Sequence, residues 1–432
     1  MTTVHDATAA GPARTDEIRR AYRRHVSRGR AKLADLFGGH VEVGSTGAWV
    51  YTSDGRRFLN AGGYGVFLHG ARHPAIVDAV VNQVRTHPIA TRLLMEPEIA
   101  RAAAALAQVT PAGLDMVHFC GSGAEAAEAA IKMARTHGRT RLIATVDGYH
   151  GKTMGALSLT GRDLYQAPFR PLLPDVTHVP FGDLPALAAA LAGGPPACVV
   201  VEPVQGEAGV VVPPSGYLTQ VARLCREHGA FLVLDEVLTG LGRLGHWWGA
   251  DREGVTPDVM LVGKALSGGV VPVAAAVATA DAFRAFDRDP FLHTSTFSGA
   301  PIAMAAARAA IVAISDENLV DRARDLGATI LTRLRAAAAP YPDLIREVRG
   351  VGLLIGVEFA GPGLAGETLT ELINEGVIVN HSLNAHTVLR LTPPAVLTAD
   401  QVDLLVGAFE AAWRSVRRRY PNPCHPGVSG HA

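Results

Sequence analysis

The sequence predicts an α/β fold built on a buried parallel sheet. Apolar runs rich in Val and Leu occur at 231–235 and 259–263, and turn residues bound both of them. Such short runs are typical of strands that are covered on both faces. A third run, 116–120, passes through a glycine turn into a helical segment that extends to about His137. In open α/β sheets, ligands bind at the carboxyl ends of the strands, so the functional residues are expected there.

The composition is ordinary for a globular protein, with 48% hydrophobic and 19% charged residues. The 432 residues allow two or three domains. Forty basic and forty acidic residues cancel, which gives no reason to expect nucleic acid or an anionic membrane as a partner. The longest apolar stretch, 270–280, contains Pro272 and is too short to span a bilayer.

Cysteine usage and the N-terminal segment both favour a cytoplasmic location. The four cysteines are scattered without a CxxC spacing, which argues against a disulfide framework and against a zinc site. No metal is therefore expected. The N-terminal segment has no apolar core of the signal-peptide type.

Two of the predicted strands end in groups that are costly to bury alone. Asp235 ends the run at 231–235, and Lys264 directly follows the run at 259–263. A buried Asp and a buried Lys close together suggest that something is bound between them. Pyridoxal phosphate (PLP) requires both groups, because a lysine amine bonds to its aldehyde and a carboxylate keeps its ring nitrogen protonated. An ion pair at the sheet edge would explain this pair of residues equally well.

The glycine turn at 121–126 has three interpretations. Glycines before a helix let backbone N–H groups approach a phosphate, which the helix dipole also favours. The GxGxxA spacing also fits a dinucleotide site, with Asp147 where a ribose-binding acid belongs. The third is a tight turn without a ligand. Lys264 together with Asp235 favours the phosphate of a single PLP.

Residues 235–245 and the string KALSGG at 264–269 closely resemble the signature of class III PLP-dependent aminotransferases. The likeness runs from about Trp49 to about Leu405 and is greatest to the putrescine and ornithine aminotransferase group. It implies the fold type I architecture, a large domain around a mostly parallel seven-stranded sheet with helices on both faces. A smaller α+β domain from both chain ends completes it. The expected division is a disordered N-terminus (1–14), a helix and hairpin of the small domain (15–70), the large PLP-binding domain (71–305), the C-terminal small domain (306–418) and a disordered tail (419–432).

The resemblance also implies the residues that hold the cofactor. Lys264 would bind PLP and then act as the catalytic base, and Asp235 would keep the ring cationic. Val237 would cover one face of the ring and Tyr149 would stack on the other. The remaining predicted contacts are His150 beside Tyr149, and the Ser122 hydroxyl and the backbone of Gly123 and Ala124 at the phosphate.

Substrate binding and assembly are further implications of the same likeness. Glu207 is expected to pair with Arg390, whose planar fork suits a carboxylate. The arginine would grip glutamate and be neutralised when an amine without a nearby carboxylate enters. The loop at 293–299 would cross to a partner subunit in a homodimer, where Thr296 completes the phosphate site. Alternatively, this loop caps the next helix through Ser298.

The sequence departs from the family pattern at Leu238, which replaces a usual glutamine, at Ala124, which replaces threonine, and at Ala300, which replaces asparagine. These changes suggest a specialised enzyme, as in secondary metabolism. The expected reaction is ping-pong transfer of an amino group between glutamate and 2-oxoglutarate on one side and a terminal amine or aldehyde on the other. The second substrate would be a diamine, an ω-amino compound or a secondary-metabolite aldehyde. Three alternatives remain: an aminomutase of the glutamate-semialdehyde type, an NAD-dependent oxidoreductase, and a catalytically silent binding protein.

Overall fold

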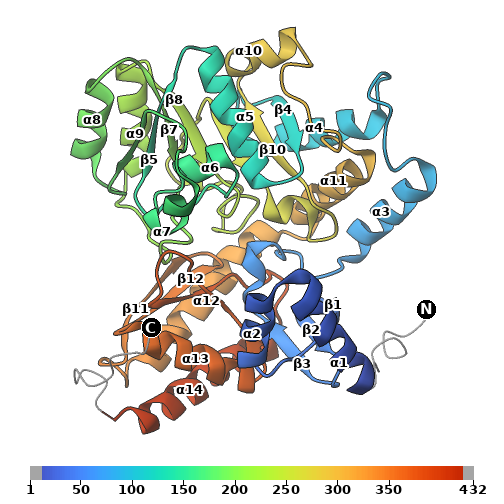
Figure 1. Cartoon of the computed structure of the whole chain (residues 1–432), viewed down its shortest axis with the longest axis vertical. Helices are drawn as coiled ribbons and strands as arrows, with labels where there is room; N and C mark the ends of the chain where they lie inside the picture. The colour runs from blue at the N-terminus through green and yellow to red at the C-terminus, as the bar shows by residue number, and fades with distance from the viewer. Residues whose placement is uncertain (1–11, 422–432) are drawn as a thin grey trace.

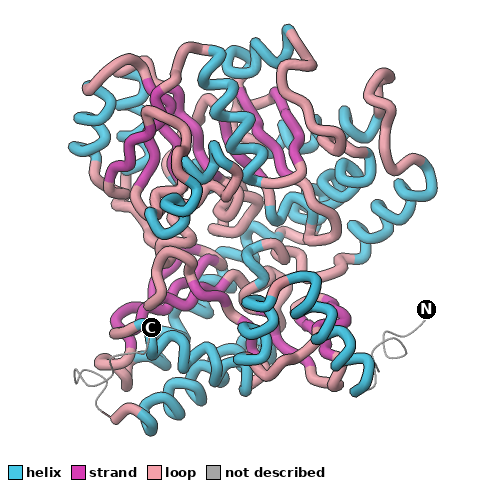
Figure 2. The backbone as a smooth tube through the Cα atoms, viewed as in Figure 1, coloured by secondary structure: helices cyan, strands magenta, loops and turns pink. Residues whose placement is uncertain are grey.

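The computed structural model describes residues 12–421 and places a seven-stranded sheet at the centre of one lobe (Figures 1 and 2). The strand order is β4-β10-β9-β8-β7-β5-β6. The five strands from β9 to β6 pair in parallel, whereas β10 is antiparallel to both of its neighbours. The bounds are β4 (Met116–Cys120), β5 (Arg141–Thr145), β6 (Val176–Val179), β7 (Ala197–Val201), β8 (Phe231–Asp235), β9 (Val259–Val262) and β10 (Ala274–Ala278).

Helices cover both faces of this sheet. Alternate residues of β8 enter different clusters of buried side chains, with Leu232 and Leu234 in one and Phe231 and Val233 in the other. The first cluster includes residues of α4 (Pro97–Val109), α8 (Leu184–Ala192), α9 (Tyr217–Glu227) and α11 (Pro301–Asp316), and the second includes residues of α5 (Gly123–Thr136), α6 (Met154–Leu159) and α10 (Ala280–Arg288). The prediction of strands buried on both faces is confirmed.

The second lobe is built from both ends of the chain, which appear blue and orange-red in the lower half of Figure 1. Two four-stranded sheets form it, in the orders β1-β2-β3-β13 and β11-β12-β15-β14. β13 pairs in parallel with β3, so that Val377 lies opposite Leu59. The elements are β1 (Glu42–Thr46), β2 (Trp49–Thr52), β3 (Arg57–Asn60), α12 (Leu319–Ala338), β11 (Ile345–Val351), β12 (Leu354–Phe359), α13 (Pro362–Asn374), β13 (Val377–Ile378), β14 (Asn380–His381), β15 (Val388–Leu391) and α14 (Ala399–Arg419). The predicted fold class is thus confirmed.

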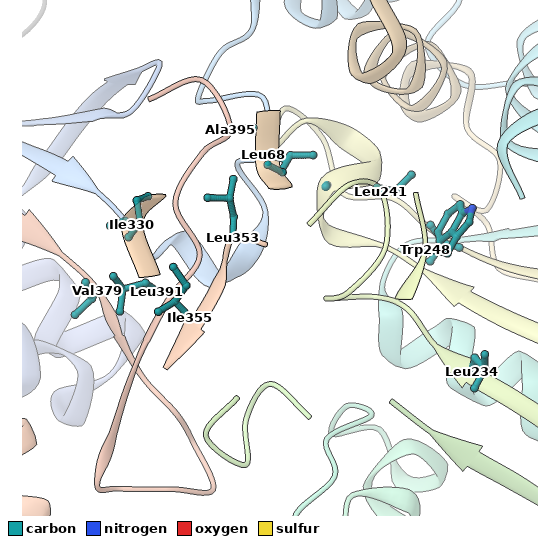
Figure 3. Close-up of a cluster of buried hydrophobic side chains, with 14 of the residues drawn as sticks. Leu68, Leu234, Leu241, Trp248, Ile330, Leu353, Ile355, Val379, Leu391 and Ala395 are labelled. Atoms are coloured by element: carbon teal, nitrogen blue, oxygen red, sulfur yellow. The ribbon is translucent and has the colours of Figure 1, made fainter. Parts of the chain in front are cut away.

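One continuous apolar core connects the two lobes. The cluster drawn in Figure 3 contains Leu234 and Trp248 from the larger lobe together with Ile355 and Leu391 from the smaller one. Leu353 belongs to the same cluster and lies between these groups in the view. This packing fixes the position of β15 relative to the strand ends of the large sheet.

The N-terminal segment differs from the prediction. A helix, α1 (Pro12–Ala21), begins inside the segment expected to be disordered, while residues 1–11 and 422–432 lie outside the described part of the chain. The helix expected at the start of the segment 15–70 is interrupted by a π-helical turn, Tyr22–Val26. Ser27 then starts α2 (Arg28–Leu36), since its hydroxyl accepts a hydrogen bond from the Arg30 amide. The next helix, α3 (Pro74–Thr86), begins at a proline, which suits the first helical position.

Candidate active site

The carboxyl ends of β7, β8 and β9 and the start of α5 enclose a pocket of about 490 Å³. This position agrees with the rule for ligand sites in open α/β sheets. Most of the predicted site residues line this pocket, namely Ser122, Gly123, Ala124, Tyr149, His150, Glu207, Asp235, Val237 and Lys264. Arg390 lies behind Glu207, and Thr296 is outside the pocket.

Lys264 and Asp235 reach the pocket from neighbouring parallel strands. Asp235 pairs in register with Leu261, three residues before the lysine. Lys264 begins a short 3-10 helix, Lys264–Ser267, with a left-handed φ of 45°, a conformation that is costly for a residue other than glycine. Burial and the nearby Arg390 lower the pKa of Lys264, although Asp235 opposes them. A lowered pKa favours the neutral amine, which is the form that attacks a carbonyl.

The carboxylate of Asp235 is held in position by two donors. Nδ1 of His150 lies 2.7 Å from one oxygen, and the backbone N–H of Val237 donates to the other at 3.0 Å. Burial would lower the pKa of His150, but the hydrogen bond to Asp235 and its charge outweigh that effect and raise it. Nε2 of His150 has no hydrogen-bond partner among the described residues. These two contacts fix the Asp235 carboxylate at the pocket wall.

The start of α5 can accept an anion. The Ser122 hydroxyl caps the helix by accepting from the Glu125 amide at 3.3 Å. The amides of Gly123 and Ala124 occupy the first turn, where backbone N–H groups have no intrahelical acceptor. A side chain at position 123 would place its Cβ 3.0 Å from Val237, so glycine lets this turn approach the pocket wall closely. These groups suit a phosphate.

Glu207 and Arg390 form a buried pair between the lobes. Nη1 of Arg390, in β15, lies 2.6 Å from Oε1 of Glu207, which follows β7. The arginine side chain has 0% exposure, and its Nε and Nη2 have no hydrogen-bond partner within residues 12–421. A buried guanidinium with unused donors is suited to a second carboxylate.

Two predicted alternatives do not agree with the structure. Ser298 does not cap α11, because the residue at the N-cap is Ala300 and the Ser298 hydroxyl donates to the Phe119 carbonyl. Asp147, the candidate ribose-binding acid, lies outside the pocket lining and pairs with Arg162 at 2.9 Å.

Three further residues line the pocket that were not among the predicted site residues. Glu202 follows β7 and lines the pocket, so the strand-end rule that singled out Asp235 could have found it. Lys152 adds a cation 4.0 Å from the centre of the Tyr165 ring. Leu238 contributes an apolar side chain to the pocket lining. Side chains at Gly65 or Gly206 would collide with it.

Glu202 gives a testable pH dependence. Burial and the charge of Asp235 raise the pKa of Glu202 to about 8. Between its ordinary value and pH 8 the folded chain therefore holds a proton that the unfolded chain releases, so this group's contribution to stability falls as pH rises. We expect Glu202→Gln to raise the thermal midpoint relative to wild type by an amount that grows from pH 5 to pH 8. A constant difference across this range would contradict the assignment.

Comparison with known proteins identifies the family. The model of the family described as Aminotransferase class-III matches residues 40–413. An ornithine aminotransferase from Toxoplasma gondii, whose structure has PLP at partial occupancy in the active site, is 29% identical with a TM-score of 0.88 over 97% of each chain. Plasmodium falciparum ornithine δ-aminotransferase is 31% identical with a TM-score of 0.78, over 88% of this chain and 94% of that one.

An (S)-enantioselective ω-transaminase from Thermomicrobium roseum is also similar. It is 28% identical with a TM-score of 0.86, over 93% of this chain and 98% of that one. The similar structures therefore include both ornithine aminotransferases and ω-transaminases. The family match covers most of the chain, and the pocket lies at the strand ends where that family's signature was recognised. The protein belongs to the class III aminotransferases.

Proposed function

We propose that the protein is a PLP-dependent aminotransferase that exchanges an amino group between glutamate and 2-oxoglutarate and a terminal amine or aldehyde, by a ping-pong mechanism. The observation that carries this proposal is the meeting of Lys264 and Asp235 in one pocket, with Glu207 and Arg390 at its side. A diamine, an ω-amino compound or the aldehyde of a secondary metabolite would be the second substrate.

The pocket residues fit PLP. Lys264 would hold the aldehyde, Asp235 the ring nitrogen, and the start of α5 the phosphate, with Val237 and Tyr149 on the two faces of the ring. Bound PLP supplies an electron sink for the substrate carbon. The chain's own part is to move the proton, which Nζ of Lys264 takes from that carbon as a general base. Asp235, held by His150, keeps a negative charge beside the ring.

Arg390 would distinguish substrates that carry a carboxylate from amines that do not. Once Glu207 moves aside, the guanidinium, whose Nε and Nη2 donors are unused within the described residues, can take the carboxylate of glutamate or 2-oxoglutarate in a two-pronged contact. When a diamine enters instead, Glu207 neutralises the guanidinium, so that the amine does not meet an unpaired cation.

We further propose a homodimer with shared active sites. Large apolar side chains are exposed on two neighbouring segments, with Leu93 at 86%, Met95 at 103% and Phe291 at 81%. Arg92 connects the segments by donating to the Ser295 carbonyl. Exposed apolar surface of this kind marks an interface.

The described cysteines support a cytoplasmic location, because three of them are free and buried. Separately, no described helix is long and apolar enough to cross a membrane.

Thr296 tests the shared site. Its side chain is exposed and lies outside its own chain's pocket, so removing the hydroxyl matters to PLP only if the loop reaches a partner's site. We expect Thr296→Ala to weaken PLP binding by about tenfold or more, because hydrogen bonds to charged groups contribute strongly. Titration of the apoprotein would measure this. Thr294→Ala, from an exposed position in the same loop, should bind PLP as the wild type does.

A single half-reaction tests the proposed chemistry. The PLP-loaded enzyme, mixed with glutamate and no acceptor, should release about one equivalent of 2-oxoglutarate per active site and then stop. Restarted turnover on adding an aldehyde would establish the second half. An aminomutase would need no external keto acid for turnover, and failure to release any 2-oxoglutarate would reject glutamate as the donor.

A further inference from the structure

Glu207 stands between the pocket and Arg390. The glutamate lines the pocket, whereas the arginine is fully buried behind it at 2.6 Å. A carboxylate that enters the pocket can therefore contact the guanidinium only after Glu207 has withdrawn. The affinity for such a ligand depends on how firmly Glu207 is held, since only the open fraction of the protein can bind.

The segment 382–387, between β14 and β15, holds Glu207 at two points. The Leu383 amide donates to Oε2 of Glu207 at 2.9 Å, on the carboxylate oxygen that does not face Arg390. The Asn384 amide donates to the Glu207 carbonyl, also at 2.9 Å. Both the side chain and the backbone of the glutamate are thus fixed by the smaller lobe.

Two side-chain contacts hold this segment against the larger lobe. The Asn384 side-chain amide, 5% exposed, donates to the Asp147 carbonyl at 2.7 Å. The Tyr165 hydroxyl donates to the Leu383 carbonyl at 3.0 Å. Neither side chain lines the pocket, so the Asn384 amide and the Tyr165 hydroxyl act on a ligand through Glu207, whereas the Tyr165 ring also contacts Lys152 of the pocket.

We propose that Leu383, Asn384 and Tyr165 form a latch that holds Glu207 on Arg390 and thereby sets the affinity for carboxylate substrates relative to amines. The latch rests on the proposed function, because it presupposes that Arg390 binds a substrate carboxylate. Asn384 and Tyr165 are positioning residues in this scheme. Loosening the latch shifts the protein toward the open state, in which Arg390 is accessible.

The sign of the effect separates a latch from a purely structural role. A net hydrogen bond stabilises one state by enough to change its population about two- to tenfold. Asn384→Ala and Tyr165→Phe should therefore tighten the binding of a dicarboxylate by about two- to tenfold each. A general loosening of the site would instead weaken it.

The probe is glutarate, a dicarboxylate that carries no carbonyl or amine to react, titrated into the PLP-loaded protein by calorimetry. The dissociation constant should fall in Asn384→Ala and in Tyr165→Phe. His386→Ala is the matched control, because this exposed residue in the same segment makes no hydrogen bond within the described chain, and its constant should equal that of the wild type. Unchanged or weaker binding in both latch variants would overturn the latch.

Arg390→Ala distinguishes the latch from the function beneath it. This variant should lose measurable glutarate binding. If it loses binding while the latch variants match the wild type, the latch is wrong and the carboxylate site stands. If glutarate binds Arg390→Ala as well as it binds the wild type, or binds no variant at all, the proposed carboxylate site fails and the latch fails with it.

Discussion

Lys264→Ala is expected to lower kcat by at least about four orders of magnitude, because the variant loses both the group that holds PLP and the base that moves the proton. Lys264 extends from the end of β9 into the pocket beside Asp235, and its lowered pKa favours the reactive amine. Initial rates with glutamate as the amino donor and an ω-amino aldehyde as the acceptor would measure the loss.

Two controls separate this loss from misfolding. The variant should keep the wild-type circular dichroism spectrum, and added methylamine should restore part of the rate by replacing the missing amine. Activity within about tenfold of the wild type would be incompatible with a general base at this position.

Asp235→Asn is expected to lower kcat by about 10²- to 10³-fold, in the range found when a fixed electrostatic group is removed from an active site. The amide fills the same space but carries no charge to support a protonated ring nitrogen. The pKa of His150 should also fall, since the hydrogen bond and charge of Asp235 are what raise it. Steady-state rates measure the first effect, and the imidazole NMR signal measures the second.

The conservative variant Asp235→Glu restores the charge and should recover part of the rate. Equal rates for Asp235→Asn and wild type would contradict the role of this carboxylate.

The contribution of His150 to stability has a definite sign. Its raised pKa stabilises the fold at acidic pH, and this effect is lost as pH rises through the pKa of the folded state.

The strand-end rule explains how much of the site the sequence reveals. Asp235 and Lys264 follow strands that are apolar throughout, and the parallel pairing of β8 with β9 brings them to one pocket. Glu202 follows β7 by the same logic, but a lone glutamate before a proline has no chemical partner nearby in sequence. Its raised pKa depends on its burial, which only the folded structure shows.

Contacts between lobes could not be predicted from local patterns. Glu207 and Arg390 belong to different lobes, and only family likeness paired them before the structure placed them 2.6 Å apart. The contact of Asn384 with the Asp147 carbonyl involves a polar residue in an irregular segment, which carries no periodic signal. Ser298 shows the converse, since a favourable capping residue instead uses its hydroxyl on the Phe119 carbonyl.

The secondary structure was likewise predictable where the local pattern is strong and not where it is weak. Apolar runs and a glycine turn predicted β4, β8, β9 and α5 within a residue or two of their observed bounds. β6, at the sheet edge, has partly exposed residues and was not predicted. The interruption at Tyr22–Val26 also lacks a proline or glycine that would signal it.

The most direct test of the account is borohydride reduction of the PLP-loaded protein, followed by peptide mass spectrometry. Reduction makes the bond between PLP and its lysine permanent, so the modified residue can be identified. The account predicts a phosphopyridoxyl group on Lys264, and its disappearance after glutamate is added before the reductant. A label on another lysine of the pocket, such as Lys152, or no label at all, would contradict it.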